Sequence, residues 1–575
     1  MLKLTRYLKP YTLSITAVFI LLFIQSLSQL YLPTLMSDIV DIGIVQGDTR
    51  YIFKVGVVML FIAAGGTVAT IAASYLSAKS ATGFGKILRN KVFTHIESFS
   101  LQGFNKIGTA SLITRTTNDI TQVQQVTMLM LRMVISAPMM IIGGVIMAVS
   151  KDAQLSIIIL VVIPLLSVAI FVIARKGLPL FKALQVKLDK LNRVLRESLT
   201  GIRVIRAFNR SEYESVRFNR ANGDLTGTAI NVNHIMVSMM PVMMFLFNLT
   251  TIAVVWFGSI RINNGSMQVG DLMAFIQYVT QIMFSLIMIS VMFVMVPRAS
   301  ASALRINEIL NMEADIKDPQ CSQGSEGKRG VVQFKDVTFR YPGAEEPVVN
   351  DITFTTFPGE VTAVIGGTGS GKSTLINLIP RFFDVESGSV KIDGVDVRDM
   401  TQKELRAKIG FIPQEAVLFT GTTAENIRYG KETATDEEVK RAAEIAQATE
   451  FISTMKDGFQ SLIAQGGINI SGGQKQRISI ARALVRKPEI YVFDDSFSAL
   501  DLKTEANLRA ALKKEILNST IIIVAQRVST VVDADRIIVL DQGRIAGIGC
   551  HKDLLEKCKV YREIVVSQLS EEELA

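Results

Sequence analysis

The chain has 575 residues, of which 49% are apolar, and it carries a formal net charge of +9. Its mean hydropathy of +0.35 is high for a soluble protein, and its length is too great for one domain. The excess of lysine and arginine does not indicate nucleic-acid binding, because most of it lies in loops beside apolar segments, where membrane topology places basic residues.

The first half of the chain contains long stretches without a charged residue, each of about 18 to 28 residues. A helix of that length crosses a hydrocarbon layer of roughly 30 Å. These stretches predict six membrane-spanning helices and not the buried helices of a soluble core. The first stretch is too long for a signal peptide, and no cleavage site follows it, so we expect a retained helix. The stretches lie between Lys9 and Asp38, Lys54 and Lys79, Arg132 and Lys151, Asp152 and Arg175, His234 and Arg261, and Asp271 and Arg298.

The loops between these stretches predict the orientation of the protein. The loops after the first, third and fifth stretches are short, whereas those after the second and fourth are long and basic, as in "KGLPLFKALQVKLDKLNRVLRE". The positive-inside rule therefore puts both termini and both long loops in the cytoplasm. The long loops also have helical apolar spacing, so we expect the spanning helices to continue into the cytoplasm. The expected location is the plasma (inner) membrane.

A change in the pattern of apolar residues near residue 330 indicates a second domain. We predict a transmembrane domain over residues 1–300, a linker over 301–330, and an α/β nucleotide-binding domain over 331–575, where apolar runs typical of strands alternate with helical segments. The three cysteines, Cys321, Cys550 and Cys558, match no metal site or disulfide framework and are predicted to be free thiols.

The segment "GGTGSGKS" matches the phosphate-binding pattern G-x-x-x-x-G-K-[ST], with a predicted strand before it and a predicted helix after it. Backbone N–H groups of such a loop wrap the phosphates of a nucleotide, here ATP, and the helix N-terminus adds a favourable dipole. Lys372 is expected to reach the outer phosphates, and Ser373 to bind Mg²⁺ together with Asp494, which ends the strand "IYVFD". The predicted nucleotide-binding residues are Gly366, Gly367, Thr368, Gly369, Ser370, Gly371, Lys372, Ser373 and Thr374.

A second glycine turn, in "INISGGQKQRISIARAL", also opens a predicted helix and is a suitable seat for phosphate. With these motifs the chain resembles the ATP-binding cassette (ABC) exporters, specifically a half-transporter in which six spans are fused to one nucleotide-binding domain with a helical subdomain. The resemblance implies a head-to-tail dimer of nucleotide-binding domains, in which each ATP lies between one chain's phosphate loop and the signature turn of the other. The signature residues are Ser471, Gly472, Gly473 and Gln474.

The same resemblance assigns further residues. Tyr341 in "FRYPG" matches the residue that stacks on adenine, and Gln414 in "FIPQEAVLF" matches the glutamine that senses Mg²⁺ and the attacking water. "SALD", ending at Asp501, matches the loop that crosses the dimer interface. "TNDITQV" and "ESLTGIRVIRAF" resemble the cytoplasmic coupling segments.

Three positions depart from the family pattern. Asp495 stands where the family has a catalytic glutamate, and it is one methylene shorter. Gln526 replaces the histidine that contacts the γ-phosphate, and a glutamine cannot become cationic. The histidines of this chain, His95, His234 and His551, lie elsewhere in the sequence. Gln465 replaces a glutamate before the signature, where altered contact with a partner is expected.

These departures weaken catalysis and leave every predicted binding residue in place. We therefore expect an ATP-driven exporter of small hydrophobic or amphipathic compounds, of the multidrug type. The chain would be the subunit of a heterodimer that contributes a degenerate ATP site (Asp495, Gln526, Gln414) and an intact signature to a second half-transporter chain. The open alternatives are drift in a slow homodimer, a homodimeric lipid or peptide flippase, and a regulatory subunit that does not pump.

The cargo is less well indicated. The Met- and Phe-rich stretches "HIMVSMMPVMMFLFNL" and "QIMFSLIMISVMFVMVP" suit either an adaptable substrate cavity or ordinary packing against helices and lipid.

Overall fold

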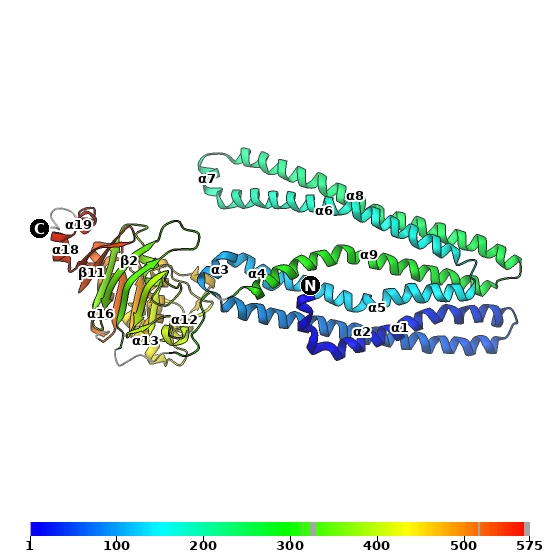
Figure 1. Ribbon diagram of the computed structural model, residues 1–575, viewed down its shortest axis with the longest axis horizontal. Helices are drawn as coiled ribbons and strands as arrows, with labels where there is room; N and C mark the ends of the chain where they lie inside the picture. The colour runs from blue at the N-terminus through cyan, green and yellow to red at the C-terminus, as the bar shows by residue number, and fades with distance from the viewer. Residues whose placement is uncertain (1, 314, 323–328, 516–517, 569–575) are drawn as a thin grey trace. The chain divides into compact units, whose positions relative to one another are not determined.

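The computed structural model describes residues 2–313, 315–322, 329–515 and 518–568 (Figure 1). The chain divides into two compact units, Met1–Ser98 with Ile107–Met312, and Phe99–Lys106 with Glu313–Ala575. Helix α9 continues to Asn311, so the predicted linker over 301–330 begins with the last turns of this helix. Residues 323–328 of that linker lie outside the described residues. The cysteines are free thiols, as expected.

The first unit holds the predicted spans. Among the described residues, 6 helical segments are long and apolar enough to cross a membrane, which confirms the number predicted. The elements up to residue 311 are η1 (Leu2–Tyr11), α1 (Thr12–Asp38), η2 (Ile39–Ile44), α2 (Thr49–Glu97), α3 (Leu101–Ile107), α4 (Thr109–Thr114), η3 (Arg115–Asp119), α5 (Ile120–Lys151), α6 (Ile157–Thr200), α7 (Ile202–Ala207), α8 (Ser211–Asn263) and α9 (Val269–Asn311). Of these, all of α3 but its last residue lies in the segment that belongs to the second unit.

The helices are much longer than the charge-free stretches within them. Helix α8 has 53 residues, which corresponds to a length of about 80 Å and exceeds the roughly 30 Å of a hydrocarbon core. The predicted extension of the spans beyond the membrane is therefore confirmed. Within the unit, α1 packs on α2, α5 on α9, and α6 on α8 (Figure 1). The short helix α7 joins α6 to α8.

At one end of the unit, polar side chains tie α1, α5 and α9 together. The Lys151 ammonium lies 2.8 Å from the Asp271 carboxylate, and the Ser37 hydroxyl donates to that same carboxylate at 2.9 Å. The backbone N–H of Gly270 donates to Asp41 at 2.6 Å. The short loops that the positive-inside rule places outside the cytoplasm lie at this end of the helices.

An ion pair with a buried carboxylate joins η3 and α9, and its Asp119 lies in the segment "TNDITQV" that was expected to couple the domains. Arg305 donates through both Nε and Nη2 to Asp119, and Ser302 donates to the same carboxylate at 2.9 Å. The Asp119 side chain is 3% exposed, whereas Arg305 is 46% exposed. The pair therefore fixes the register of two long helices outside the charge-free stretches.

We expect Arg305→Met to destabilise the first unit by about 2 kcal/mol, because it leaves the Asp119 carboxylate buried without its cation. The cost is below that of a fully buried pair, since Arg305 is half-exposed. The matched control is Lys317→Met, which breaks a pair with Glu313 in which both side chains are exposed and should leave the melting temperature unchanged. Thermal unfolding of the purified protein measures both. Equal melting temperatures for the two variants would contradict this reading of Asp119.

The second unit contains all the strands of the described chain. A 6-stranded sheet has the order β12-β11-β3-β10-β9-β6, and a 4-stranded sheet has the order β2-β1-β4-β5. In the larger sheet β12 is antiparallel to β11 and the other neighbouring strands are parallel. The strands are β1 (Val332–Phe339), β2 (Val349–Thr356), β3 (Val361–Gly366), β4 (Ser387–Ile392), β5 (Val395–Asp396), β6 (Ile409–Ile412), β7 (Gly421–Thr422), β8 (Leu462–Ile463), β9 (Ile490–Asp494), β10 (Thr520–Val524), β11 (Arg536–Asp541) and β12 (Arg544–Gly549).

Helices cover this sheet and form the helical subdomain that the resemblance implied. Strands β9 and β10 are buried at every residue, which accounts for their continuous apolar sequence. The helices are α10 (Lys372–Asn377), α11 (Gln402–Ala407), α12 (Thr423–Arg428), α13 (Asp436–Ile445), α14 (Thr449–Thr454), η4 (Gly458–Gln460), η5 (Gln465–Gly467), α15 (Gly472–Leu484), α16 (Leu502–Glu515), α17 (Val528–Val531), α18 (His551–Lys557) and α19 (Lys559–Val566). The subdomain consists of α12 to α15, between β6 and β9.

Candidate functional site: a phosphate loop and two carboxylates

Three neighbouring parallel strands, β3, β10 and β9, bring the predicted site together. Because their carboxyl ends share one edge of the sheet, the loop after Gly366, the segment after Val524 and the end of β9 at Asp494 are adjacent. The catalytic positions predicted far apart in the sequence, Asp495 and Gln526, follow directly on two of these strands. The sheet order therefore builds one site from separate motifs.

The phosphate loop has the backbone geometry that its glycines predict. Gly371 has φ 93°, a left-handed conformation that suits glycine, and caps helix α10. At Gly366 an added Cβ would lie 2.2 Å from the Leu540 carbonyl oxygen, so only glycine fits there. The Lys372 ammonium, which is buried, donates to the carbonyl oxygens of Gly366 and Gly367 at 2.9 and 2.7 Å. Lysine thus spans the loop and holds a positive charge where phosphate would bind.

Ser373 and Asp494 meet across the site, as predicted for a magnesium pair. The Ser373 hydroxyl donates to Asp494 Oδ1 at 2.8 Å. A hydroxyl and a carboxylate are oxygen ligands of the kind Mg²⁺ prefers, and Mg²⁺ commonly takes only one or two protein ligands beside phosphate oxygens and water. The residues therefore fit this ion, which would neutralise phosphate charge when bound. The Ser370 hydroxyl is buried and has no hydrogen-bond partner within the described chain, so this loop atom remains available to a phosphate.

Asp495 is the centre of a hydrogen-bonded cluster. Its φ of 46° is left-handed, a conformation that aspartate tolerates better than most residues, and its N–H donates to the Val524 carbonyl at 3.0 Å. The side-chain amides of Gln526 and Gln414 both donate to Asp495 Oδ2, at 2.8 and 3.2 Å. One carboxylate oxygen is therefore engaged by two neutral donors.

Burial sets the electrostatics of this cluster. Burial raises the pKa of Asp494 and of Asp495 above the usual range of a carboxyl, against the opposing effect of their hydrogen bonds. Burial likewise lowers the pKa of Lys372. Two buried carboxylates face one buried ammonium, so the site carries excess negative charge that a cation would offset. The Gln526 side chain is neutral, whereas a histidine at this position could be protonated and carry a positive charge.

Tyr341 lies in an aromatic group at the start of the domain. Its ring contacts Phe339 and Phe383 edge-on, with centroids 5.0 and 5.4 Å away, and its hydroxyl lies 3.1 Å from the Thr374 hydroxyl. This contact links the aromatic ring to helix α10 of the phosphate loop. Tyr341 therefore lies beside the helix that follows the phosphate loop.

We expect Tyr341→Ala to weaken ATP binding about tenfold, because stacking of a base on an aromatic ring contributes about 1–3 kcal/mol. Tyr341→Phe, which keeps the ring and loses only the contact to Thr374, should bind ATP within about twofold of the parent. Calorimetric titration with ATP measures both. Equal weakening by both variants would show that the hydroxyl, and not the ring, matters.

The signature turn stands apart from this cluster. Ser471 caps α15, with a reciprocal pair of hydrogen bonds to Gln474, and an added Cβ on Gly472 would meet nothing within 4 Å. Within the described residues, no hydrogen bond joins Ser471–Gln474 to the phosphate loop. The N-terminus of α15 is therefore open on the side of Gly472. Gln465 is exposed in η5, close in sequence to this turn.

The structure adds residues that the sequence did not single out. Ser498 donates to the Asp495 carbonyl at 2.7 Å, and Gln476 of α15 donates to the Pro413 carbonyl, next to Gln414, at 3.2 Å. Gln102, from the first cytoplasmic loop, borders a cavity of about 310 Å³ beside Tyr341. Hydrogen bonds to backbone atoms have no signature in sequence, so these residues could be found only from the fold.

The comparisons with known proteins identify the family of this chain. The transmembrane region of ABC transporters matches residues 15–286, and the ABC transporter domain matches residues 349–498. The chain is 42% identical to an uncharacterized ABC transporter ATP-binding protein of Mycobacterium tuberculosis, over 98% of this chain and 97% of the relative. It is 33% identical to an ATP-dependent lipid A-core flippase of Desulfotalea psychrophila, over 81% of this chain and 82% of that protein.

The fold has a close counterpart among solved structures. A bacterial Atm1-family ABC exporter with ATP bound superposes with a TM-score of 0.82, at 24% identity, over 97% of this chain and 98% of the other. The chain therefore belongs to the ABC transporters, as an exporter half-transporter with six spans and one nucleotide-binding domain. It is a multi-pass membrane protein that binds ATP and couples its hydrolysis to transport, and half-transporters of this kind act as dimers in the membrane.

Proposed function

We propose that this chain is the subunit of a heterodimeric exporter that holds ATP at a degenerate site and completes the hydrolytic site of its partner. The observation that carries the proposal is the cluster at Asp495, where Gln526 and Gln414 donate to the same carboxylate oxygen. A general base must reach its water, and a misplacement of about 1 Å costs on the order of a hundredfold in rate. The shorter Asp495 would have this deficit, and both amides already engage its Oδ2 atom.

The binding residues support the other half of the proposal. Lys372, Ser373 and Asp494 are positioned to hold MgATP, and the signature turn is intact. A site that binds nucleotide and lacks a well-placed base would retain ATP for long periods. Turnover would then occur at the site formed by this chain's signature and the phosphate loop of the partner. The nucleotide-binding domain would lie in the cytoplasm, below the plasma (inner) membrane.

Exposed apolar side chains at helix α7 support the proposed contact with a second chain. Val204 and Phe208, at α7, are 60% and 73% exposed. Exposed apolar side chains that lie together usually mark an interaction surface. These residues belong to "ESLTGIRVIRAF", which we propose as a coupling segment. A second half-transporter chain is the partner that the signature turn also requires.

The test is to purify the chain from its native cells through an affinity tag and to measure the mass of the intact complex. The proposal predicts a complex of this chain with one different half-transporter that carries glutamate and histidine at the two departing positions. A mass of two identical chains would contradict it. A second purification uses the variant Val204→Asn, Phe208→Asn, which replaces the two exposed apolar side chains at α7 by polar ones. This variant should recover less of the partner chain.

A homodimeric lipid flippase is the second candidate, favoured by the 33% identity to a lipid A-core flippase. Both candidates use the same ATP-binding domains and carry apolar cargo. They differ in whether the second chain of the dimer is a different or an identical chain. For the cargo itself we propose hydrophobic or amphipathic compounds, as a multidrug-type exporter carries. ATP-dependent uptake of a fluorescent amphiphile into inside-out vesicles separates either pump from a regulatory subunit that moves nothing.

A further inference from the structure

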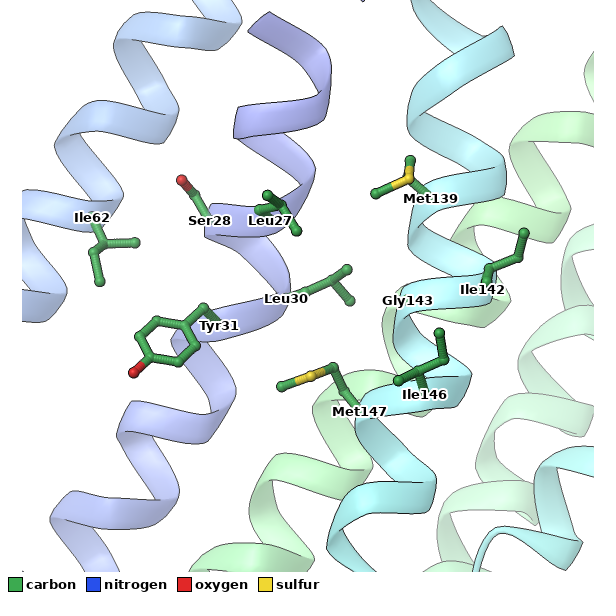
Figure 2. A pocket seen from close by; sticks show the side chains of 10 residues that line it. All are labelled: Leu27, Ser28, Leu30, Tyr31, Ile62, Met139, Ile142, Gly143, Ile146 and Met147. Atoms are coloured by element: carbon green, nitrogen blue, oxygen red, sulfur yellow. The ribbon is translucent and has the colours of Figure 1, made fainter. Parts of the chain in front are cut away.

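Two cavities lie among the membrane helices, on either side of α1, and they differ in chemistry. The first, of about 620 Å³, lies between α1, α2 and α5. Figure 2 shows Met139 and Met147 of α5 facing α1, with the hydroxyl-bearing Ser28 and Tyr31 turned toward α2. The second, of about 690 Å³, lies between α1, α2 and α9. Neither cavity is lined by the Met-rich stretch of α8, residues 234–249.

The second cavity, which we call the glutamine cavity, combines carboxamides with adaptable apolar side chains. Its lining residues are Gln29, Leu32, Pro33, Met36, Met59, Met273, Ala274, Ile276, Gln277 and Gln281. Polar side chains inside a membrane span are costly and therefore usually functional. Unbranched methionines fit ligands of varied shape. The cavity thus offers hydrogen bonds and a flexible apolar wall in one place.

The orientation of one carboxamide is fixed by its contact. Gln281 Nε2 donates to the Gln29 backbone carbonyl at 3.2 Å, and only the NH₂ group can donate, so the side-chain oxygen must be the other atom. That oxygen is buried and has no hydrogen-bond partner within the described chain. An unsatisfied buried acceptor is unfavourable. After a rotation of the Gln281 side chain toward the cavity, a ligand that carries an N–H or O–H donor would satisfy this oxygen. Gln277 lies one turn before Gln281, on the same face of α9.

None of the described residues that line the glutamine cavity is charged. The charged residues nearest to its lining on α1 and α9 are Asp38 and Asp271, each two positions from the lining residues Met36 and Met273. Two positions turn a side chain about 200° around a helix, away from the cavity. Asp271 is also paired with Lys151. A charged head group would therefore lose its water without gaining a counter-charge.

We propose that the glutamine cavity binds the uncharged polar group of an amphipathic molecule, one that both donates and accepts hydrogen bonds, such as a carboxamide or hydroxyl. This proposal rests on the proposed export of amphipathic compounds and names the class of head group it selects. The apolar body of the molecule lies against Leu32, Ile276 and the methionines. Gln277 and Gln281 supply the specificity.

The test is photolabelling of the full chain in lipid nanodiscs without nucleotide, using alkyl diazirines of equal chain length. Their head groups are a primary carboxamide, a carboxylate and a trimethylammonium. Mass mapping of peptides then compares labelling at residues 273–281, which line the glutamine cavity alone, with labelling at 139–147, which line the first cavity and report the amount of probe in the bilayer. The carboxamide probe should label the glutamine cavity about tenfold more than either charged probe.

The double variant Gln277→Leu, Gln281→Leu should reduce carboxamide labelling of the cavity about tenfold and leave labelling at 139–147 unchanged. Leucine is well tolerated in a spanning helix, so the variant should fold. The matched control is Gln25→Leu on α1, outside both cavities, which should change nothing. Gln277→Glu should raise labelling by the trimethylammonium probe.

Equal labelling by all three head groups, a preference for a charged probe, or an unaffected double variant would each overturn the proposal. The labelling needs neither hydrolysis nor the partner chain. Brisk turnover by identical chains would therefore contradict the proposed function without changing the labelling result, and the two failures can be told apart.

Discussion

The double variant Asp495→Glu, Gln526→His is expected to raise ATP turnover at this chain's own site by about a hundredfold. Glutamate adds the methylene that brings a carboxylate oxygen to the attacking water. Histidine removes the amide that donates to Asp495 Oδ2 at 2.8 Å in the present site, and it restores a group that can carry a proton. Steady-state phosphate release by the purified chain measures the change.

Each single variant should raise ATP turnover by less than the double variant does. The two side chains share one hydrogen bond, so their effects on turnover are coupled. Asp457→Glu is the matched control, since it lengthens an exposed aspartate of the same domain by the same methylene. It should leave turnover unchanged. If the double variant hydrolyses ATP no faster than the parent, the length of the Asp495 side chain and the Gln526 amide do not limit the site.

Gly472→Asp in the signature turn is expected to reduce turnover of the assembled transporter by about a hundredfold or more. An aspartate in the first turn of α15 is favourable for the helix, and its Cβ would meet nothing within 4 Å, so the fold is retained. Its negative charge, however, lies where the phosphate of the partner's ATP is expected, and loss of electrostatic stabilisation at such a site costs about 10²–10³ in rate.

Two comparisons make this prediction specific. Gly458→Asp adds the same charge to the same domain, at a left-handed position with φ 53° that aspartate tolerates, and it should leave turnover unchanged. The equivalent glycine-to-aspartate change in the partner chain faces the degenerate site and should leave most of the turnover. Equal losses from the changes in the two chains would show that both sites hydrolyse ATP alike, contrary to the proposed asymmetry.

The regular patterns in the sequence were sufficient to predict most of the fold. Charge-free stretches of membrane-spanning length predicted the 6 spans, because the thickness of a hydrocarbon layer fixes the length of an apolar helix. The glycines of Gly366–Gly371 predicted the phosphate loop, because its backbone geometry excludes a side chain at Gly366. Asp495 and Gln526 were predicted as catalytic departures, and the sheet order β3-β10-β9 explains why they meet.

Features that depend on contacts between distant segments could not be predicted in this way. The coupling segments were expected at "TNDITQV" and "ESLTGIRVIRAF". Their coupling role stays a prediction. The sequence did not single out Phe99–Lys106, which belongs to the second unit, where Ser100 donates to Asp315 at 2.9 Å. The helical pattern after residue 296 indicated a helix there, but the exact end of α9 at Asn311 depends on its packing. The two donors on Asp495 Oδ2 could be identified only from coordinates.

The most direct test of the central claim is single-turnover hydrolysis of radiolabelled ATP, with the chain reconstituted in lipid alone and together with its partner chain. The proposed asymmetry predicts that the chain alone binds ATP and retains it over many turnover times of the pair, while the pair releases phosphate from about half of the bound nucleotide. Rapid hydrolysis of all bound ATP by the chain alone, accompanied by movement of an amphiphile, would contradict it.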